Sequence, residues 1–204
     1  MIFQKVWADQ IPYMESLKEQ EKLKTKCLET NKNFALCFHC PAVITMGLRG
    51  SEEDLMLKKS EYEKKNIPII PIKRGGQATL HSQGQLVLYP IANIKQNKFR
   101  VKDFVHFIEQ ATKETLAQMG IATHKEEGQA GLFTSKGKIA FFGIHVTEGV
   151  SQHGLAINID NDLKLFDLIR SCGVSHRVHD KLSNYCKADI QEVFDLWIKT
   201  AKRT

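Results

Sequence analysis

The sequence predicts an α/β (α+β) fold with a mixed central sheet and flanking helices. Short strand-like segments outnumber the helical ones, and several follow one another without a helix in between. Strand and helix do not alternate regularly, which argues against a purely parallel sheet. The chain contains no internal repeat and no Pro/Ser-rich linker, so residues 1–204 are expected to form a single domain.

The expected helices are marked by the spacing of apolar residues. In residues 11–30 and 101–119 these recur at helical intervals with charged residues between them. Gly120 follows the second segment and suits the left-handed residue that often ends a helix. Shorter helices are expected at about residues 163–169 and 190–202. These four segments would cover the sheet.

The remaining apolar segments predict strands. Two prolines in residues 67–72 suit an edge strand, because proline cannot donate a hydrogen bond to a neighbouring strand. Residues 78–81 and 85–91 are expected to pair with each other around Ser82-Gln83-Gly84, and residues 51–65 to form a charged, exposed segment. The other expected strands are residues 1–8, 34–40, 42–48, 132–135, 138–146 and 154–160.

Composition excludes several classes of protein. Hydrophobic residues make up 42% and charged residues 25% of the chain, as in ordinary globular proteins and unlike disordered ones. Apolar stretches such as residues 139–144 are too short to span a bilayer, and no signal-type segment is found. The five cysteines are an odd number, which favours reduced thiols. A cytoplasmic protein without a membrane partner is therefore expected.

The net charge of +6 favours an anionic partner. Nucleic acid would fit this charge, but the basic residues are spread along the chain. An arginine-rich tail and an aromatic-and-basic recognition stretch are both absent from the sequence. We therefore expect no nucleic-acid partner, and an acidic protein or an anionic small molecule fits better.

Three short motifs suggest metal or phosphate sites but lack essential features. Cys37 and Cys40 have C-x-x-C spacing, yet no second ligand pair follows and a strand would point them to opposite faces, which favours simple burial. Residues 131–138 have five residues between their glycines, whereas a phosphate loop has four. His176 and His179 lack a third ligand nearby, which favours a solvated loop. No metal site is predicted.

Three other segments carry residue types that suit a catalytic site. The paired glycines Gly75 and Gly76 allow backbone to approach a ligand closely, and His81 follows them. Lys138 opens an apolar strand, where desolvation would lower its pKa and make it a base. Cys172 lies just past a short helix and before a glycine, an accessible place for a nucleophile. Taken singly, each segment also fits a structural role as a tight turn, an exposed strand-end lysine or a buried cysteine.

Five motifs in order resemble the lipoyl(octanoyl) transferase family, over nearly the whole chain. They are His39-Cys40-Pro41-Ala42-Val43-Ile44-Thr45-Met46-Gly47, Arg74-Gly75-Gly76…Thr79…His81…Gly84-Gln85, Gly137-Lys138-Ile139-Ala140, His153-Gly154-Leu155-Ala156-Ile157-Asn158 and Cys172-Gly173-Val174. The resemblance implies the biotin/lipoate protein ligase catalytic-domain fold. It also implies transfer of an octanoyl group from octanoyl-acyl carrier protein to a specific lysine of lipoyl domains, those of 2-oxoacid dehydrogenases and the glycine cleavage H protein. Neither a metal nor a nucleotide cofactor is implied.

The resemblance assigns roles to individual residues. Cys172 would be the nucleophile that carries the acyl group as a thioester, and Lys138 would be its general acid and base. The residues expected to line the acyl and thioester site are Arg74, Gly75, Gly76, Gln77, Ala78, Thr79, Leu80, His81, Phe141, Phe142, Gly143, Gly154, Leu155 and Ala156. Ser82-Gln83 and Ser171 depart from the family's Gly-Pro and Pro, which concerns substrate positioning more than the chemistry.

Two other functions compete with this interpretation. An ATP-dependent lipoate or biotin protein ligase would share the fold, but it makes an acyl-adenylate and needs no cysteine nucleophile. A non-catalytic protein that binds acyl carriers or lipoyl domains would be expected to lack Cys172 or Lys138, and both are present. The sequence therefore favours the transferase.

Overall fold

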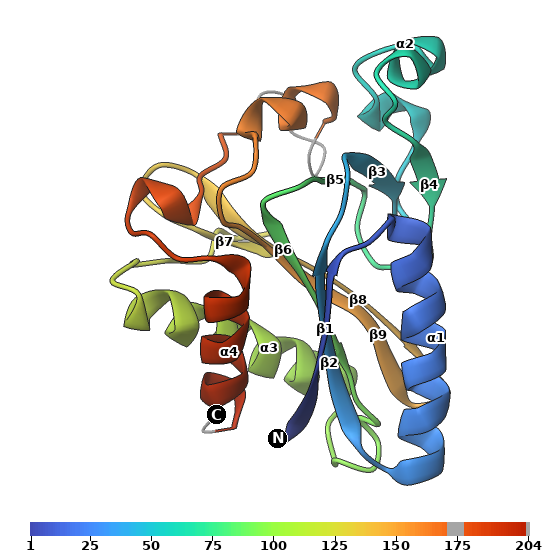
Figure 1. The fold of residues 1–204 in the computed structure, drawn as a ribbon, viewed down its shortest axis with the longest axis vertical. Helices are drawn as coiled ribbons and strands as arrows, with labels where there is room; N and C mark the ends of the chain where they lie inside the picture. Colours follow the sequence, from blue (N-terminus) through green and yellow to red (C-terminus); the bar gives the residue numbers. More distant parts are fainter. Residues whose placement is uncertain (171–177, 203–204) are drawn as a thin grey trace.

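A six-stranded mixed sheet forms the centre of the computed structural model, which describes residues 1–170 and 178–202 (Figure 1). The strand order is β1-β2-β6-β9-β8-β7, with β1 and β2 parallel and the other neighbours antiparallel. This confirms the predicted mixed sheet. Its strands are β1 (Phe3–Gln10), β2 (Asn33–His39), β6 (Gln85–Ile91), β7 (Gly131–Phe133), β8 (Lys138–Thr147) and β9 (Val150–Asn158).

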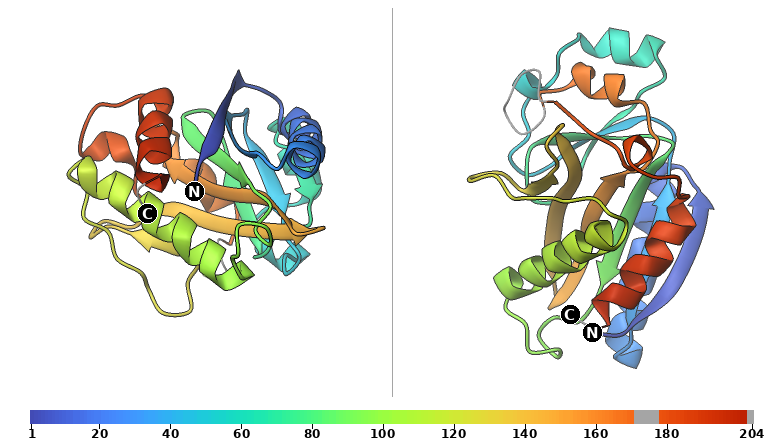
Figure 2. Two further views of the ribbon diagram at one scale, coloured as in Figure 1. Left: turned by 90° about the horizontal axis from the view of Figure 1, so that it is seen from below. Right: turned by 90° about the vertical axis from the view of Figure 1, so that its left-hand side faces the viewer.

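Helices cover both faces of this sheet (Figure 2). α1 (Tyr13–Thr30) packs on one face, and α3 (Val101–Gln118) and α4 (Ile190–Ala201) pack on the other. Alternation along β2 explains this, because Cys37 joins the apolar cluster under α3 and α4 while Phe38 joins the cluster under α1. None of the helices in the described part of the chain is long and apolar enough to cross a membrane.

A second, three-stranded sheet lies at one end of the molecule (Figure 1). It consists of β3 (Val43–Met46), β4 (Ile69–Pro71) and β5 (Ala78–His81) in the order β4-β3-β5, so the edge position predicted from two prolines is confirmed. The predicted pairing of residues 78–81 with 85–91 is wrong. β5 pairs with β3, whereas β6 pairs with β2 and β9.

The turn at Gly84 explains why β5 and β6 separate. Gly84 has φ +82°, a conformation that favours glycine, and its carbonyl accepts hydrogen bonds from the N–H groups of Ile159 and Asp160. A side chain there would lie 2.9 Å from the nitrogen of Asn161. The turn is therefore held against the chain after β9, and it passes the backbone from the small sheet to the large one.

The small elements correct one further expectation and specify the helix type of another. Residues 51–65 are not uniformly exposed, since they form η1 (Glu52–Asp54) and α2 (Lys59–Lys64) with Tyr62 fully buried. The Tyr62 hydroxyl donates to the carbonyl of Leu168 and accepts from the N–H of Met56. Residues 163–169, expected as a helix, form the 3-10 helix η2 (Leu163–Leu168), and a further 3-10 turn is η4 (Leu182–Asn184).

Gly154 on β9 gives a prediction about stability. A methyl group at this position would lie 2.4 Å from the carbonyl oxygen of Leu88 and 2.4 Å from Cδ of Pro90, both on the paired strand β6. Gly154→Ala should therefore lower the free energy of unfolding by about 3 kcal/mol, the upper end of overpacking costs. Chemical denaturation measures this. Gly75→Ala is the matched control, because the nearest atom to its methyl group is 3.5 Å away. Equal stability of the two variants would contradict the close packing of β6 on β9.

Candidate active site

A pocket of about 190 Å³ is lined by residues of both sheets. Lys138 and all of the expected substrate-binding residues except Gly75 and Leu80 line it. Leu80 is fully buried in an apolar cluster with Ile44 and Tyr62, on the opposite side of β5 from His81. The N–H of Gly75 donates to the carbonyl of Ile144 on β8. Three of the five motifs, those at residues 74–85, 137–140 and 153–158, thus meet around one cavity.

Close packing of backbone forms one wall of the pocket. At Gly143 on β8 a methyl group would lie 3.1 Å from Cδ of Arg74 and 3.2 Å from the carbonyl oxygen of Gly75. The guanidinium of Arg74 donates to the carbonyl oxygen of Thr45 at 2.7 Å and to its hydroxyl at 2.9 Å. The segment before β5 is therefore fixed between the two sheets, with a buried cation beside the cavity.

Lys138 stands at the start of β8 with its side chain fully buried. Its Nζ lies 4.8 Å from the ring centroid of Phe141 and 5.6 Å from that of Phe133. Room for the amine comes from Gly131 on β7, where a methyl group would lie 2.3 Å from Cε and 3.0 Å from Nζ of Lys138. The structure thus places this amine inside the pocket, not at an exposed strand end.

Cys172 lies outside the described residues, as do Ser171, Gly173 and His176. The chain before them is held where the N–H of Arg170 donates to the carbonyl of Asp54 at 2.7 Å. The chain after them pairs with β8: the N–H of Lys138 donates to the carbonyl of Val178 at 3.0 Å, and the N–H of Asp180 donates to the carbonyl of Lys138 at 2.9 Å. Residues 178–180 therefore run directly beside Lys138.

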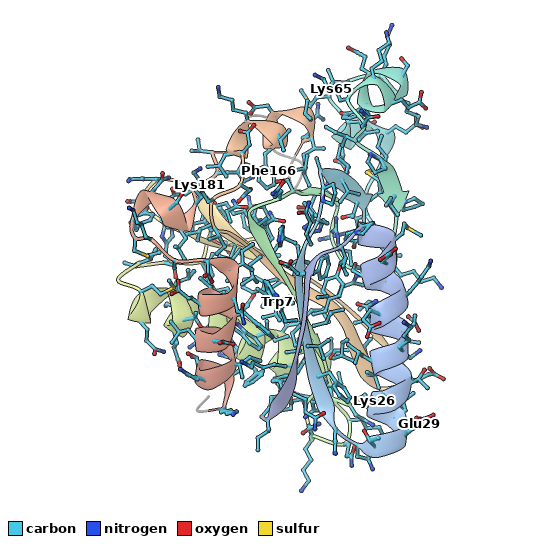
Figure 3. All side chains as sticks on the ribbon, in the orientation of Figure 1. Trp7, Lys26, Glu29, Lys65, Phe166 and Lys181 are labelled. Carbon is cyan, nitrogen blue, oxygen red and sulfur yellow. The ribbon has the colours of Figure 1, made fainter. Side chains whose placement is uncertain are left out.

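Aromatic rings fix this returning segment. The ring of His179 stacks on Phe166 at 4.0 Å between centroids and on Phe141 at 5.7 Å. Phe166 is the buried residue of η2 and is labelled in Figure 3. The expectation that His179 belongs to a solvated loop is wrong, because its ring is half-buried and packs against two aromatic rings.

A row of rings lines another part of the pocket. Tyr13 stacks on His81 at 5.6 Å, its hydroxyl lies 3.1 Å from that of Tyr89, and Tyr89 meets His153 edge-on at 5.4 Å. Burial, together with the charge of Arg74, lowers the pKa of His81 to about 4 and that of His153 to about 3. Both imidazoles are therefore neutral at pH 7.

Sequence reasoning missed several residues of this lining. Tyr13 and Tyr89 sit in apolar periodic segments, a pattern that predicts core and carries no sign of a pocket. His153 stands at the head of the fourth motif, which is the signal that could have identified it. The pocket-lining residues that were not predicted are Tyr13, Arg49, Val87, Tyr89, Gly128, Gln129, Ala130 and His153.

The cysteine pair behaves as predicted. Cys37 and Cys40 are both fully buried and belong to different apolar clusters. Burial raises the pKa of the Cys40 thiol to about 12, so it is a thiol at neutral pH. Within residues 1–170 and 178–202, no group of three or more His, Cys, Asp or Glu side chains is placed to hold a metal ion.

Comparison with solved structures supports the fold. Lipoate-protein ligase A bound with ATP superposes with a TM-score of 0.83 at 15% identity, covering all of this chain and 85% of the other. A bi-partite lipoate protein ligase from Thermoplasma acidophilum gives 0.75 at 12% identity, covering 100% and 84%. Biotin protein ligase from Aquifex aeolicus gives 0.54. At such identities the likeness concerns the fold alone, and the predicted fold class is confirmed.

Comparison with sequences adds the family. The model of the lipoyl protein ligase A/B catalytic domain matches residues 12–202. An octanoyltransferase of Francisella tularensis subsp. novicida is 38% identical over 175 residues, which is 85% of this chain and 82% of the relative. One of Marinobacter nauticus is 37% identical over 164 residues, 80% and 74% respectively. The resemblance seen in the five motifs is confirmed: the chain belongs to the lipoyl protein ligase A/B catalytic domain family, among relatives that are octanoyltransferases.

Proposed function

We propose that this protein transfers an octanoyl group from octanoyl-acyl carrier protein to a lysine of lipoyl domains, through a thioester on Cys172. The observation that carries the proposal is the fully buried amine of Lys138, whose backbone pairs with residues 178–180, close in sequence to Cys172. Relatives at 37–38% identity are octanoyltransferases, which supports the acyl group and the reaction.

The first half-reaction exchanges one thioester for another. Free cysteine has a pKa of about 8.5, so only a few per cent is thiolate at neutral pH. Lys138 takes the proton of the Cys172 thiol, and the thiolate attacks the carbonyl carbon of the donor. The bond to the carrier sulfur breaks, and Lys138 returns the proton to that sulfur. General base assistance of this kind is worth about 10² to 10⁴ in rate.

The second half-reaction moves the acyl group to nitrogen. The acceptor lysine attacks as a neutral amine, the C–N bond forms and the C–S bond breaks. Lys138 passes the proton from the nitrogen to the Cys172 sulfur. Phe141, Phe142 and Leu155 line the pocket with apolar surface for an eight-carbon chain, at about 0.8 kcal/mol per buried CH₂.

The proposed partners follow from this chemistry. The donor is octanoyl-acyl carrier protein, and the acceptors are lipoyl domains of 2-oxoacid dehydrogenases and the glycine cleavage H protein. The lipoate ligase of T. acidophilum was solved in a study with its E2 lipoyl domain, which supports the acceptor class. Free thiols at Cys27, Cys37, Cys40 and Cys186 suit the reducing cytoplasm.

Intact-protein mass spectrometry after mixing with octanoyl-acyl carrier protein tests the acyl-enzyme. We expect a single octanoyl adduct on Cys172 that an apo lipoyl domain discharges. Cys172→Ser should give no thioester adduct, whereas Cys186→Ser, which removes another free and partly buried thiol, should load normally. Acceptor modification only when ATP and free octanoate are supplied would instead identify an ATP-dependent ligase.

Lys138→Ala should lower the transfer rate by about 10² to 10⁴ at pH 7, because it removes the proposed general base. The rate of the variant should rise as pH approaches the thiol pKa of about 8.5, where thiolate forms without assistance. Lys136→Ala is the matched control, since this lysine is exposed. Steady-state kinetics from pH 6 to 9 would measure both variants. An undiminished rate of Lys138→Ala at pH 7 would contradict the role of Lys138 as general base.

Gly131→Ala should reduce transfer while Lys138 is retained. Its methyl group would displace Cε and Nζ of Lys138, and it would also lie 2.7 Å from the carbonyl oxygen of Ala140. Some loss of stability is therefore expected as well. Gly120→Ala controls for this, because Gly120 has φ +79° with no atom within 4 Å of the added methyl group. Equal activity of the two variants at equal folded fraction would show that the position of the amine is unimportant.

A further inference from the structure

A chain of buried hydrogen bonds runs from the pocket to the backbone after Cys172. Nδ1 of His81 lies 2.7 Å from Oε1 of Gln85, whose Nε2 donates to Oδ1 of Asn158 at 2.9 Å. Nδ2 of Asn158 donates to the carbonyl oxygen of Asp180 at 3.0 Å. Gln85 and Asn158 have no exposed surface, and His81 is 6% exposed. Water therefore cannot replace any hydrogen-bond partner in this chain.

The direction of every bond in this chain is fixed from its far end. The carbonyl of Asp180 can only accept, so Asn158 must present its NH₂ group there and its oxygen toward Gln85. Asn161 also donates to that oxygen, at 3.2 Å. Gln85 must then present its NH₂ group to Asn158 and its oxygen to His81. Nδ1 of His81 therefore carries the hydrogen.

The opposite nitrogen of His81 is left as an acceptor. Burial keeps the pKa of this imidazole at about 4, so at pH 7 a hydrogen on Nδ1 means a lone pair on Nε2. His81 lines the pocket, and Tyr13 stacks on its ring at an interplanar angle of 12°. Among the residues that the structure describes, none hydrogen-bonds to Nε2.

We propose that Gln85 and Asn158 are positioning residues that hold His81 as its Nδ1–H tautomer, so that Nε2 accepts a hydrogen bond from the attacking amine of the acceptor lysine. The inference rests on the proposed octanoyl transfer. A thioester carbonyl and a thiolate have only lone pairs, which an acceptor nitrogen repels, whereas the neutral amine has N–H groups to donate. The hydrogen bond orients the amine toward the acyl carbon.

This role of His81 leaves the proton transfers of the second half-reaction unchanged. The C–N bond forms, the C–S bond breaks, and the proton leaves nitrogen through Lys138 to the Cys172 sulfur. His81 holds one N–H of the amine and takes no proton, because an imidazole with a pKa of about 4 is a weak base. The titratable and charged groups that line the pocket with it are Tyr13 on α1, Arg49 after β3, Arg74 before β5, Tyr89 on β6, Lys138 on β8 and His153 on β9.

Nitrogen NMR of the ¹⁵N-labelled full-length protein tests the tautomer directly. The His81 imidazole should show a protonated Nδ1 and an unprotonated Nε2 from pH 6 to 8, the reverse of the tautomer that free histidine prefers. Assignment comes from the resonance lost in His81→Gln. A protonated Nε2 would overturn the proposal without any variant of the buried amides having to fold.

Separate measurement of acyl loading and discharge tests the role in catalysis. Gln85→Glu places a carboxylate beside Nδ1 and favours imidazolium, whose Nε2 donates instead of accepting. Loading from octanoyl-acyl carrier protein should stay within about threefold of wild type. Discharge to a lipoyl domain should fall by about tenfold at pH 7, the size of one hydrogen bond, and recover as pH rises. Gln118→Glu makes the same change on α3, outside the pocket, and should alter neither step.

Substitutions of the ring give a second comparison. The amide oxygen of His81→Gln can reach the position of Nε2, whereas that of His81→Asn reaches only the position of Nδ1. Discharge should therefore be faster in His81→Gln. Equal discharge by these two variants, or an unchanged pH profile in Gln85→Glu, would overturn the role of Nε2. Wild-type protein that never loads octanoate would instead remove the proposed function, while the tautomer found by NMR would stand.

Discussion

Close packing of the segment before β5 against β8 is the constraint on which the pocket depends. The small sheet reaches the large one only because Gly143 leaves room for the side chain of Arg74 and the carbonyl of Gly75. Arg74 in turn donates to Thr45 on β3, so its guanidinium joins the second strand of the small sheet to the same contact. A larger residue at 143 would separate the sheets, and the pocket between them would lose a wall.

Burial of Lys138 is a second feature of the site, one that costs free energy, and neighbouring residues accommodate it. A buried amine costs free energy that surface lysines avoid. Gly131 on the adjacent strand provides the space, and the rings of Phe133 and Phe141 surround Nζ. Departures of this kind from the usual exposure of lysine are typical of functional sites. The backbone of the same residue pairs with Val178 and Asp180, so one strand position serves both sheet pairing and the proposed proton transfer.

Local sequence patterns predicted the positions of helices and strands better than they predicted which strands pair. Apolar spacing identified α1, α3 and α4, and the spacing of Cys37 and Cys40 in an extended chain explained why they join different apolar clusters. The true partners of β5 and β6 could not be predicted, because a short turn between two strands looks alike in sequence whether it closes a hairpin or passes the chain to another sheet. Tyr13 and Tyr89 were missed for a related reason: an aromatic residue on an apolar face predicts core, and only tertiary structure shows that the core opens there. Alternation along β5 did contain the evidence that Leu80 points away from His81.

The backbone of Asp180 connects the two halves of the proposed chemistry. Its N–H donates to Lys138 and its carbonyl accepts from Asn158, so one peptide segment orients the strand that carries the amine and the chain that orients His81. Burial alone would raise the pKa of the Asp180 carboxyl, but hydrogen bonds from Thr134, Tyr185 and Asn184 outweigh it and lower the pKa. The carboxylate thus stays ionised and anchors the segment firmly. Lys138, the proposed proton acceptor, and His81, the proposed hydrogen-bond acceptor, would act on the same nitrogen, and the backbone of Asp180 is linked to both.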